Sequence, residues 1–362
     1  GAGRVLELGS GTGMLLLRLA PGCERYVGLD FSQESLRYVG AQLRRRGLQD
    51  VKLLQRAAHQ IDDLEQDYEL VILNSVAQYF PSHTYFRDVV KAALRRLQPG
   101  GRLFLGDLRN LAVEEAFAAG LALQRVGVGS TAVELRHAAQ SEEALDAELL
   151  LDPAALAWQI RRWAQDSGVA LDLVQVLPRE GQAHNELSGY RYDVVVHKAA
   201  QDAGRDDAAA DEAALSWSSW REDAWNIERL QQALQTLAQG QAPLLALQDV
   251  PNARVIADAH VAEWLQEMTG WRTAGELRVR LGQLDPQEAV DPHALHTLAQ
   301  DLGLELEMSW AQGAADGSLR VLFARPGAID ASHRHALHAP AAQGRERPWS
   351  NRPQQVQRRR EL

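Results

Sequence analysis

The sequence predicts an α/β fold, a Rossmann-like sheet with helices on both faces, followed by a second, smaller α/β subdomain. Three observations lead to this prediction. Short apolar runs alternate with helical patterns over about the first hundred residues, and their near-continuous apolar character is typical of buried parallel strands. The first run leads directly into the glycine-rich segment Gly9–Gly13. The second run ends at an acid, Asp30.

The remaining elements follow in order along the chain. Pro99, Gly100 and Gly101 predict a tight turn into the fifth strand. Residues 111–165 are rich in Ala, Leu, Glu and Gln and are expected to be mostly helical. Two later strands flank a loop of about 14 residues. The seven strands are expected at Val5–Leu8, Tyr26–Leu29, Val51–Leu54, Leu70–Leu73, Arg102–Gly106, Ala170–Val176 and Arg191–His197.

Composition changes along the chain predict the domain boundaries. The polar, acidic stretch after residue 200 is typical of a linker. We expect a core over 1–200 with a helical insertion at about 111–165, a linker over 201–214, and an α/β subdomain over 215–326. Arginine, proline and glutamine near the end indicate a basic tail over 327–362 that leads to a next domain.

The tryptophan-rich second region repeats a pattern from the end of the first. Asp152 and Pro153 open a helix that precedes a strand, and Asp291 and Pro292 do the same before strands at Leu304–Trp310 and Leu319–Ala324. Asp before Pro suits a helix start, so the echo indicates either convergent capping or a degenerate duplicated half. The second region has no glycine-rich loop and is expected to bind no cofactor of its own.

Composition sets limits on the class of protein. The net charge of −10 argues against a nucleic-acid footprint over the whole surface. The single cysteine, Cys23, has no internal partner, so we expect a reducing, cytoplasmic compartment. The sequence has no apolar run long enough for a membrane span and no leader peptide. It does not begin with Met and starts almost on a strand, as a piece of a longer chain would.

The glycine segment and Asp30 predict a nucleoside site. Glycine permits positive φ and leaves no Cβ between the loop and a ligand. A carboxylate at the end of the second strand is placed to accept hydrogen bonds from ribose hydroxyls. The spacing E-x-G-x-G-x-G from Glu7 to Gly13 differs from the phosphate-binding G-x-G-x-x-G. A phosphate-binding Rossmann site and an unoccupied glycine turn remain as alternatives.

An ordered series of motifs resembles a known family. The series includes VLELGSGTGMLLLRLAP with GLDFS, LNSVAQYFPS, QPGGRLFLGDLRNL, AELLLDP, AHNELSGYRYDVVVHK, DVPNARV and VDPHALHTLAQDLGLELEMSWAQGAADGSLRVLFARP. It resembles the class I S-adenosylmethionine-dependent methyltransferase domains embedded in nonribosomal peptide synthetases and polyketide synthases. The resemblance implies an antiparallel last strand, S-adenosylmethionine as cofactor and S-adenosylhomocysteine as product. It also implies two kinds of partner: a phosphopantetheinylated carrier domain with tethered substrate, and neighbouring domains of the same megasynthase.

The resemblance also implies the residues of the cofactor site. The glycines pass the methionine moiety with Glu7 in support, Asp30 holds the ribose, and the residues after the third strand contact the adenine. The family commonly has an acid where this chain has His59. The implied cofactor residues are Glu7, Gly9, Gly11, Gly13, Asp30, Phe31, Ala58, His59 and Asn74.

Three groups are candidates for the acceptor side. His184, Asn185 and Glu186 combine base, amide and carboxylate in one loop, with His184 or Glu186 as base and Asn185 orienting the acceptor. An ordinary polar loop is the alternative from spacing alone, and the resemblance favours the catalytic interpretation. The other candidates are substrate-binding: Tyr79, Asp107, Arg109, Tyr190 and Arg191, with local packing or ion pairing as the alternative.

The predicted function is transfer of the methyl group of S-adenosylmethionine to the α-amino nitrogen of a carrier-tethered aminoacyl group. Methylation of a hydroxyl on a tethered polyketide intermediate is the first alternative, and a catalytically inactive structural domain is the second. Partners are expected to include neither nucleic acid nor membrane. No metal site is expected, and His333, His335 and His338 are interpreted as a surface cluster.

Overall fold

The computed structural model describes residues 3–200, 215–285 and 289–353, which divide into two units. The first unit comprises Gly1–Leu108, Ala157–Gln175 and Asp193–Asp206, and the second comprises Arg109–Leu156, Val176–Tyr192 and Asp207–Leu362. This division differs from the boundary expected near residue 200, since most of the helical insertion groups with the C-terminal region. The expected linker over 201–214 lies outside the described residues.

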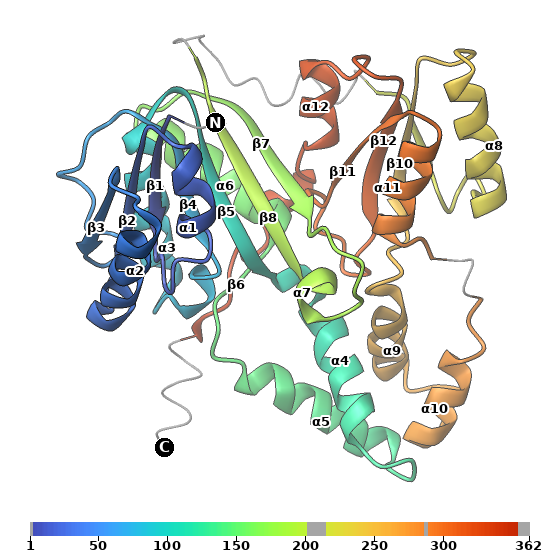
Figure 1. The fold of residues 1–362 in the computed structure, drawn as a ribbon. Coiled ribbons are helices and arrows are strands. Elements are labelled where there is room, and N and C mark those ends of the chain that lie inside the picture. The colour runs from blue at the N-terminus through green and yellow to red at the C-terminus, as the bar shows by residue number, and fades with distance from the viewer. Residues whose placement is uncertain (1–2, 201–214, 286–288, 354–362) are drawn as a thin grey trace. The chain divides into compact units, whose positions relative to one another are not determined.

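The main sheet has the order β3-β2-β1-β4-β5-β8-β7, with the short β6 paired to β5 (Figure 1). The pairs from β3 to β5 are parallel. Gly100 N–H bonds to Ala199 O and Asn110 N–H to Tyr190 O, so β8 runs antiparallel to β5. The strands are β1 (Arg4–Leu8), β2 (Arg25–Asp30), β3 (Val51–Gln55), β4 (Tyr68–Asn74), β5 (Leu97–Asn110), β6 (Leu150–Leu151), β7 (Leu171–Pro178) and β8 (Arg191–Lys198).

These strands confirm all seven predicted from the apolar runs, and the α/β class with them. The fifth differs most, because it begins at Leu97 and includes the Pro-Gly-Gly turn, where Gly100 has a φ of 75°. The core around β1 and β2 is an apolar cluster that includes Val5, Leu16 and Tyr26. The helices joining the strands of the first unit are α1 (Leu16–Leu19), α2 (Gln33–Arg46) and α3 (His83–Arg96), while α6 (Pro153–Asp166) spans the division between units.

A four-stranded sheet of order β11-β12-β10-β9 forms the centre of the second unit. Its strands are β9 (Trp217–Ser219), β10 (Leu244–Val250), β11 (Glu305–Ser309) and β12 (Leu319–Ala324). The second region is therefore an α/β subdomain, as predicted. Its helices, together with those of the insertion, are α4 (Glu114–Arg125), α5 (Ala132–Leu145), α7 (Glu186–Gly189), α8 (Ile227–Ala238), α9 (Ile256–Glu267), α10 (Ala274–Leu281), α11 (Pro292–Asp301) and α12 (Ala331–Leu337).

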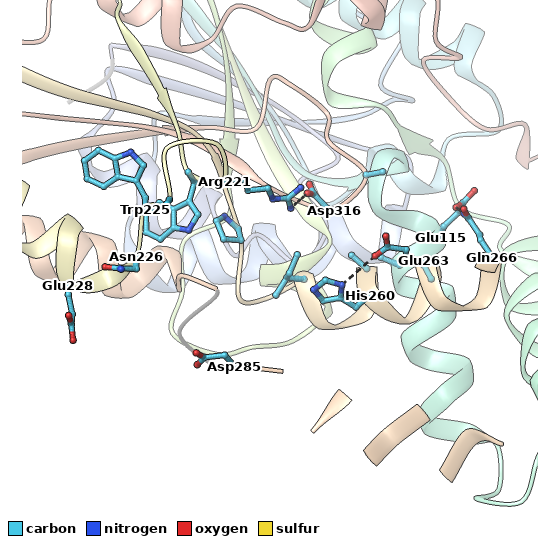
Figure 2. Close-up of a pocket in the computed structure, with 18 residues that line it drawn as sticks. Glu115, Arg221, Trp225, Asn226, Glu228, His260, Glu263, Gln266, Asp285 and Asp316 are labelled. Atoms are coloured by element: carbon cyan, nitrogen blue, oxygen red, sulfur yellow. Dashed lines mark hydrogen bonds and ion pairs between the residues drawn. The ribbon is translucent and has the colours of Figure 1, made fainter. Parts of the chain in front are cut away.

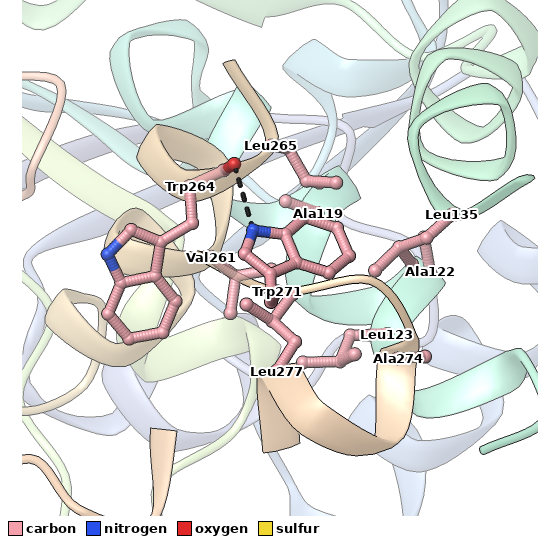
Figure 3. Close-up of a cluster of buried hydrophobic side chains, with 10 residues drawn as sticks. All are labelled: Ala119, Ala122, Leu123, Leu135, Val261, Trp264, Leu265, Trp271, Ala274 and Leu277. Carbon is pink, nitrogen blue, oxygen red and sulfur yellow. Dashed lines mark hydrogen bonds between the residues drawn. The ribbon is translucent and has the colours of Figure 1, made fainter. Parts of the chain in front are cut away.

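A buried apolar cluster joins the insertion to the C-terminal region (Figure 3). Trp271 lies at its centre, 6% exposed, and its indole N–H donates to Trp264 O at 3.3 Å. The cluster combines side chains of α4 and α5 with those of α9 and α10, and so explains why the insertion groups with the second unit. Its buried members are Ala119, Ala122, Leu123, Leu135, Val261, Trp264, Leu265, Trp271, Ala274 and Leu277.

The part of the expected basic tail that the structure describes is folded. Helix α12 lies within it, and Asn351 donates to Glu148 O at 2.8 Å and accepts from Leu150 N–H at 3.0 Å. The predicted surface cluster of histidines is wrong for His338, which is fully buried and lies 2.9 Å from Ser309 Oγ through Nδ1. The end of α12 faces the small sheet, and the burial of His338 follows from that packing. Among the described residues, no helix has the length and apolar character needed to span a membrane.

Candidate active site

The glycine-rich loop leaves the carboxyl end of β1 in a conformation that requires glycine. Gly9, Gly11 and Gly13 have φ angles of 77°, 50° and 79°. A Cβ on Gly9 would lie 2.6 Å from Val76 Cγ2, too close for any other residue to fit without movement. Gly9 N–H donates to Leu29 O at 2.8 Å, which holds the start of the loop against β2. The backbone is thus shaped to pass close to a ligand.

Asp30 ends β2 and faces this loop. Its Oδ2 accepts from Gly11 N–H at 2.8 Å, and its Oδ1 accepts from Ser32 N–H at 2.8 Å. The residue is 7% exposed. An ionised carboxylate offers about four lone-pair positions, so two remain for hydroxyl donors such as those of a ribose.

Glu7 lies beneath the loop as a buried acid. It is 4% exposed, and its Oε2 accepts from the hydroxyl of Tyr26 at 2.9 Å. Burial is the main cause that raises the pKa of the Glu7 carboxyl to about 7; the hydrogen bond from Tyr26 acts to lower it, and the charge of Asp30 acts to raise it. Glu7 therefore changes its charge near neutral pH.

A cavity of about 570 Å³ opens beside these groups, within the range of about 300–1,000 Å³ usual for small-molecule sites. Three large apolar side chains on its lining are exposed, Met14 at 77%, Phe31 at 79% and Tyr79 at 71%. Large apolar groups left in water at a cavity are typical of a binding site. Of the predicted cofactor residues, the lining includes Glu7, Gly9, Gly11, Asp30, Phe31, Ala58 and Asn74.

Asn74 lies at the end of β4, where the fold leaves room for it. Gly106 on the paired strand provides that room, because a Cβ there would lie 2.2 Å from Asn74 Oδ1. The amide Nδ2 donates to Ser75 Oγ at 3.0 Å, and Ser75 has a positive φ of 57°. The side chain therefore lies on the cavity wall at the last residue of the strand, and the backbone turns at Ser75.

Two predicted cofactor residues, Gly13 and His59, do not line the cavity. Gly13 lies at the loop's far end, where a Cβ would come within 2.9 Å of Val39 Cγ2, so it serves close packing against α2. His59 Nδ1 lies 2.9 Å from the hydroxyl of Tyr85, and it is Tyr85 that reaches the lining.

The cavity lining also includes residues that sequence reasoning missed. Ser10 is 5% exposed, and its hydroxyl has no hydrogen-bond partner among the described residues. Its place between two glycines of the motif was the available signal. Thr12 also lies between two glycines of the motif. The others lie just before α1 or after β3 or β4 and carry no pattern of their own: Met14, Leu15, Arg56, Ala57, Ser75, Val76, Phe80, Pro81 and Tyr85.

These features fit S-adenosylmethionine. The three glycines of the loop have no Cβ that would obstruct a ligand. Asp30 can accept further hydrogen bonds. The hydroxyl of Ser10 is a buried donor without a partner among the described residues. Glu7 and Asp30 place negative charge near a cationic cofactor. Nothing in the lining resembles the lysine of a phosphate-binding loop.

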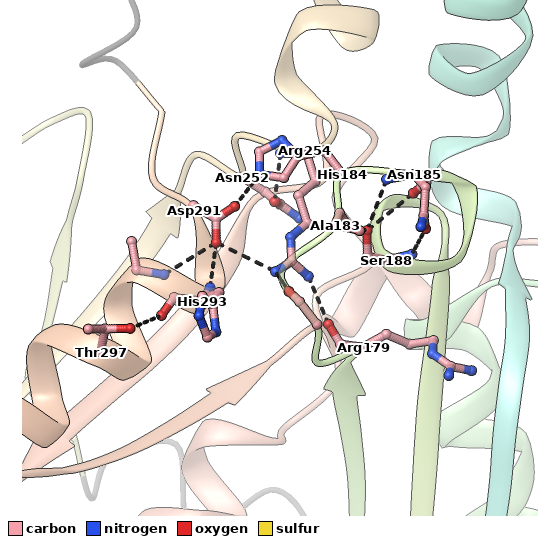
Figure 4. A network of polar contacts seen from close by, with 12 residues as sticks. Arg179, Ala183, His184, Asn185, Ser188, Asn252, Arg254, Asp291, His293 and Thr297 are labelled. Atoms are coloured by element: carbon pink, nitrogen blue, oxygen red, sulfur yellow. Dashed lines mark hydrogen bonds and ion pairs between the residues drawn. The ribbon is translucent and has the colours of Figure 1, made fainter.

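The predicted catalytic loop belongs to the second unit and is held by polar contacts (Figure 4). His184 Nε2 contacts Asp291 Oδ2. Asn185 caps α7, where its Oδ1 accepts from Ser188 N–H at 3.1 Å. Glu186 Oε1 accepts from Arg191 at 2.7 Å. All three predicted catalytic side chains therefore have defined partners within this unit.

Arg109, predicted to bind substrate, lies in a buried ion-pair cluster. Its guanidinium lies 3.2 Å from Glu114 and 3.2 Å from Glu148, and it also pairs with Asp146. Burial is the largest influence on Glu114 and raises the pKa of its carboxyl to about 8, although Arg109 acts to lower it. The contacts match the alternative of local ion pairing more closely than a substrate ligand.

The remaining substrate candidates have contacts of different kinds. Asp107 has a positive φ of 63°, and its N–H donates to Asp193 Oδ1 at 2.7 Å. The hydroxyl of Tyr190 bonds to Asp258, and burial raises the pKa of Tyr190 far above its usual value. Of the substrate candidates, Tyr79 alone lines the 570 Å³ cavity.

A second cavity of about 1,000 Å³ lies wholly within the second unit, along α9 and the segment around Trp225 (Figure 2). Its labelled lining is mostly polar, and Arg221 pairs with Asp316 across it. His260 and Glu263 form another pair on α9, 3.5 Å apart. The described residues contain no group of three or more His, Cys, Asp or Glu that could hold a metal ion.

Comparison with known proteins agrees with this site. Residues 5–101 match the family model described as a methyltransferase domain. The chain is 34% identical over 93% of its length to chondramide synthase cmdD from Chondromyces crocatus, and spans 8% of that protein. It is 33% identical over 90% of its length to nonribosomal peptide synthetase dtxS1 from Metarhizium robertsii, and 29% identical over 89% to cyclosporin synthetase simA from Tolypocladium inflatum. It spans 4% and 2% of these two proteins.

The strand order, the glycine loop and the family match together define a class I S-adenosylmethionine-dependent methyltransferase domain. Within that class, the chain resembles the methyltransferase domains embedded in nonribosomal peptide synthetases. Both predictions made from the motif series, the class and the resemblance, are confirmed.

Proposed function

We propose that this domain methylates the α-amino nitrogen of an aminoacyl group tethered by a phosphopantetheine arm to a carrier domain of the same assembly line. The observation that carries the proposal is the similarity over 90% of the chain, both units included, to a protein named as a nonribosomal peptide synthetase. Peptide synthesis uses amino groups, so the aminoacyl nitrogen is the acceptor that such a protein presents.

We assign the cofactor residues with the support of the cavity lining and the resemblance. Asp30 would hold the ribose and Glu7 would face the cationic part of the cofactor, while the loop backbone passes the methionine moiety. S-adenosylmethionine supplies an electrophilic methyl group on a sulfonium when bound. The remaining assigned residues are Gly9, Gly11, Gly13, Phe31, Ala58, His59 and Asn74, of which Gly13 and His59 would support the site from behind its lining.

The acceptor residues follow from what nitrogen requires. An ammonium has no lone pair, so a base must take its proton before nitrogen can form the new bond to carbon. We assign His184 or Glu186 as that base and Asn185 as the residue that orients the acceptor. Tyr79 would line the acceptor path. Asp107, Arg109, Tyr190 and Arg191 would shape the acceptor site through the contacts described above.

The experiment loads a phosphopantetheinylated carrier domain with alanyl, N-acetylalanyl or lactyl groups and supplies S-adenosylmethionine with the 362-residue chain. We expect mass spectrometry to detect a methyl group on alanyl alone. Methylation of the lactyl hydroxyl instead would overturn the proposal in favour of O-methylation. If no methyl group is transferred to any of the three groups and the cofactor also fails to bind, the proposal would be overturned in favour of a catalytically inactive structural domain.

A second experiment measures cofactor binding by calorimetric titration with S-adenosylmethionine and S-adenosylhomocysteine. We expect binding by the intact chain, and a loss of about tenfold or more in Asp30→Ala, since a charge-assisted hydrogen bond contributes about 1.5–3 kcal/mol. Asp30→Asn keeps the side-chain volume and controls for folding. Equal affinity in all three proteins would contradict the assignment of Asp30.

A further inference from the structure

Two motifs of the C-terminal region meet the loop that carries His184. DVPNARV ends β10 and begins α9, and VDPHALH begins α11. Figure 4 shows Arg254 of the first motif and Asp291 of the second reaching the segment between β7 and β8. The function described so far assigns neither residue.

Arg254 is buried and holds this loop through hydrogen bonds. Its side chain is 1% exposed. The guanidinium donates to Arg179 O at 2.9 Å and also to Gly181 O. Gly189 lies against the same residue, because a Cβ on it would come within 3.1 Å of Arg254 O. Arg254 therefore contacts the loop on both sides of His184.

Asp291 contacts both Arg254 and the imidazole of His184. Its Oδ1 caps α11, accepting from His293 N–H at 2.6 Å, and lies 3.5 Å from the Arg254 guanidinium. Its Oδ2 contacts His184 Nε2. Burial would raise the pKa of Asp291, but the hydrogen bonds from His184 and the α11 backbone, with the charge of Arg254, lower it overall. Asp291 is therefore an anion whose orientation is set before it meets the histidine.

An ionised carboxylate accepts hydrogen bonds and donates none. Nε2 must then carry the proton of the neutral imidazole, which leaves the lone pair on Nδ1. The side chain of His184 is 53% exposed, so the ring keeps access to its surroundings. This is the general arrangement of a base whose tautomer is set by an acid partner.

We propose that Asp291, anchored by Arg254, is a positioning residue that holds His184 in its Nε2–H tautomer and so presents Nδ1 as the base for the acceptor ammonium. The proton would move from the acceptor nitrogen to Nδ1. The freed lone pair would then form the bond to the methyl carbon while the bond between that carbon and the sulfonium sulfur breaks, with S-adenosylhomocysteine as the leaving group. The assignment rests on the proposed function and selects His184 over Glu186. It also assigns the C-terminal region a task, which is to hold the loop that carries His184.

The kinetic test uses Asp291→Asn, because Asn is as good a helix cap as Asp. The substitution removes the charge and replaces one acceptor oxygen with an amide NH2, which donates. We expect kcat for the alanyl carrier to fall about tenfold or more while KM changes little. His184→Ala should lower kcat about a hundredfold or more, as loss of a general base does. The double variant should be no slower than His184→Ala, since the two residues act as one unit. Multiplying losses, or an unchanged kcat in Asp291→Asn, would overturn the proposal.

Asp330→Asn is the matched control. Asp330 also caps a helix, α12, and its Oδ1 lies 3.0 Å from Nδ1 of a histidine, His333, which belongs to that same helix. We expect its kcat to equal that of the unaltered chain. A loss equal to that of Asp291→Asn would mean that any capping aspartate has this effect.

A spectroscopic arm separates this inference from the proposed function. Long-range ¹H–¹⁵N spectra of the imidazoles report the tautomer of each ring, and the signals absent from His184→Ala identify His184. We expect the Nε2–H form in the unaltered chain and a mixture of tautomers in Asp291→Asn. An unchanged tautomer in Asp291→Asn would overturn the inference even if the domain methylates amines. The expected spectra with no methyl transfer to alanyl would overturn the proposed function alone.

Discussion

The hydroxyl of Tyr26 donates a 2.9 Å hydrogen bond to Glu7 Oε2, and both side chains are buried in the sheet of the first unit. Glu7 lines the cofactor cavity, whereas Tyr26 does not. Because this bond lowers the pKa of a carboxyl that burial raises to about 7, Tyr26 influences the charge of the cavity from behind its wall.

Replacement of Tyr26 should therefore shift the pH dependence of cofactor binding. S-adenosylmethionine carries a positive sulfonium, so its affinity should rise as Glu7 ionises on passing through about pH 7. Tyr26→Phe removes a bond that favours the ionised form, and the rise should move to higher pH. Calorimetric titration across this range measures the shift. Tyr68→Phe, at another buried tyrosine of the sheet, should leave the profile unchanged, and an identical profile in Tyr26→Phe would contradict the account.

Glu7 should also make folding stability depend on pH. Its pKa is raised from 4.5 to about 7, so the folded chain keeps a proton that the unfolded chain has released. The free energy of unfolding should therefore fall as pH rises from about 4.5 to 7, by on the order of 3 kcal/mol from this group. Glu7→Gln should flatten that part of the curve, measured by urea unfolding at several pH values. A slope equal to that of the unaltered chain would exclude Glu7 as its source.

The glycines of the loop should differ in their tolerance of alanine. Gly9→Ala meets both a positive φ and Val76 at 2.6 Å, whereas Gly11→Ala meets a positive φ in open space. Gly11→Ala should cost about 1–2 kcal/mol of stability, the price of a left-handed residue, and Gly9→Ala more. Urea unfolding gives the ranking and calorimetry gives the parallel loss of cofactor affinity. Gly22→Ala, which has open space and no positive φ, is the control.

Trp271 should stabilise the second unit without acting on the cofactor. Trp271→Ala removes the indole at the centre of the cluster in Figure 3 and should cost about 3–5 kcal/mol. Trp271→Phe keeps an aromatic ring, loses the bond to Trp264 O and should cost less. Thermal unfolding followed by tryptophan fluorescence measures both variants. S-adenosylmethionine affinity should be unchanged, and a parallel loss would show that the cluster supports the cofactor site.

Much of the first unit could be predicted because its signals are local. A buried parallel strand is apolar along its whole length, so β1, β2 and β4 stand out in the sequence. The glycines and Asp30 also lie within one strand-loop-helix-strand segment, where spacing alone limits the geometry. The start of β5 was less predictable, because β5 pairs with β4 on both sides of the turn at Gly100.

The second unit was harder to predict because its contacts join distant segments. His338 looks like a surface residue in a basic tail, yet contact with Ser309 and Val176 buries it. The helices of the insertion are visible in sequence, but only Trp271 and its neighbours show which region they pack against. The sequence did not show that three carboxylates, from different segments of the chain, surround Arg109.

The sequence by itself determined the α/β class, the glycine loop with its carboxylate, and the resemblance to methyltransferase domains, since each depends on residue types at short spacing. The tertiary structure decided which residues surround each ionisable group. It brought Asp291 to His184, which lies 107 residues away in sequence, and buried Glu7 against Tyr26. The physical reason is that desolvation and hydrogen bonding depend on neighbours in space, and neighbours in space are set by the packing of the whole unit.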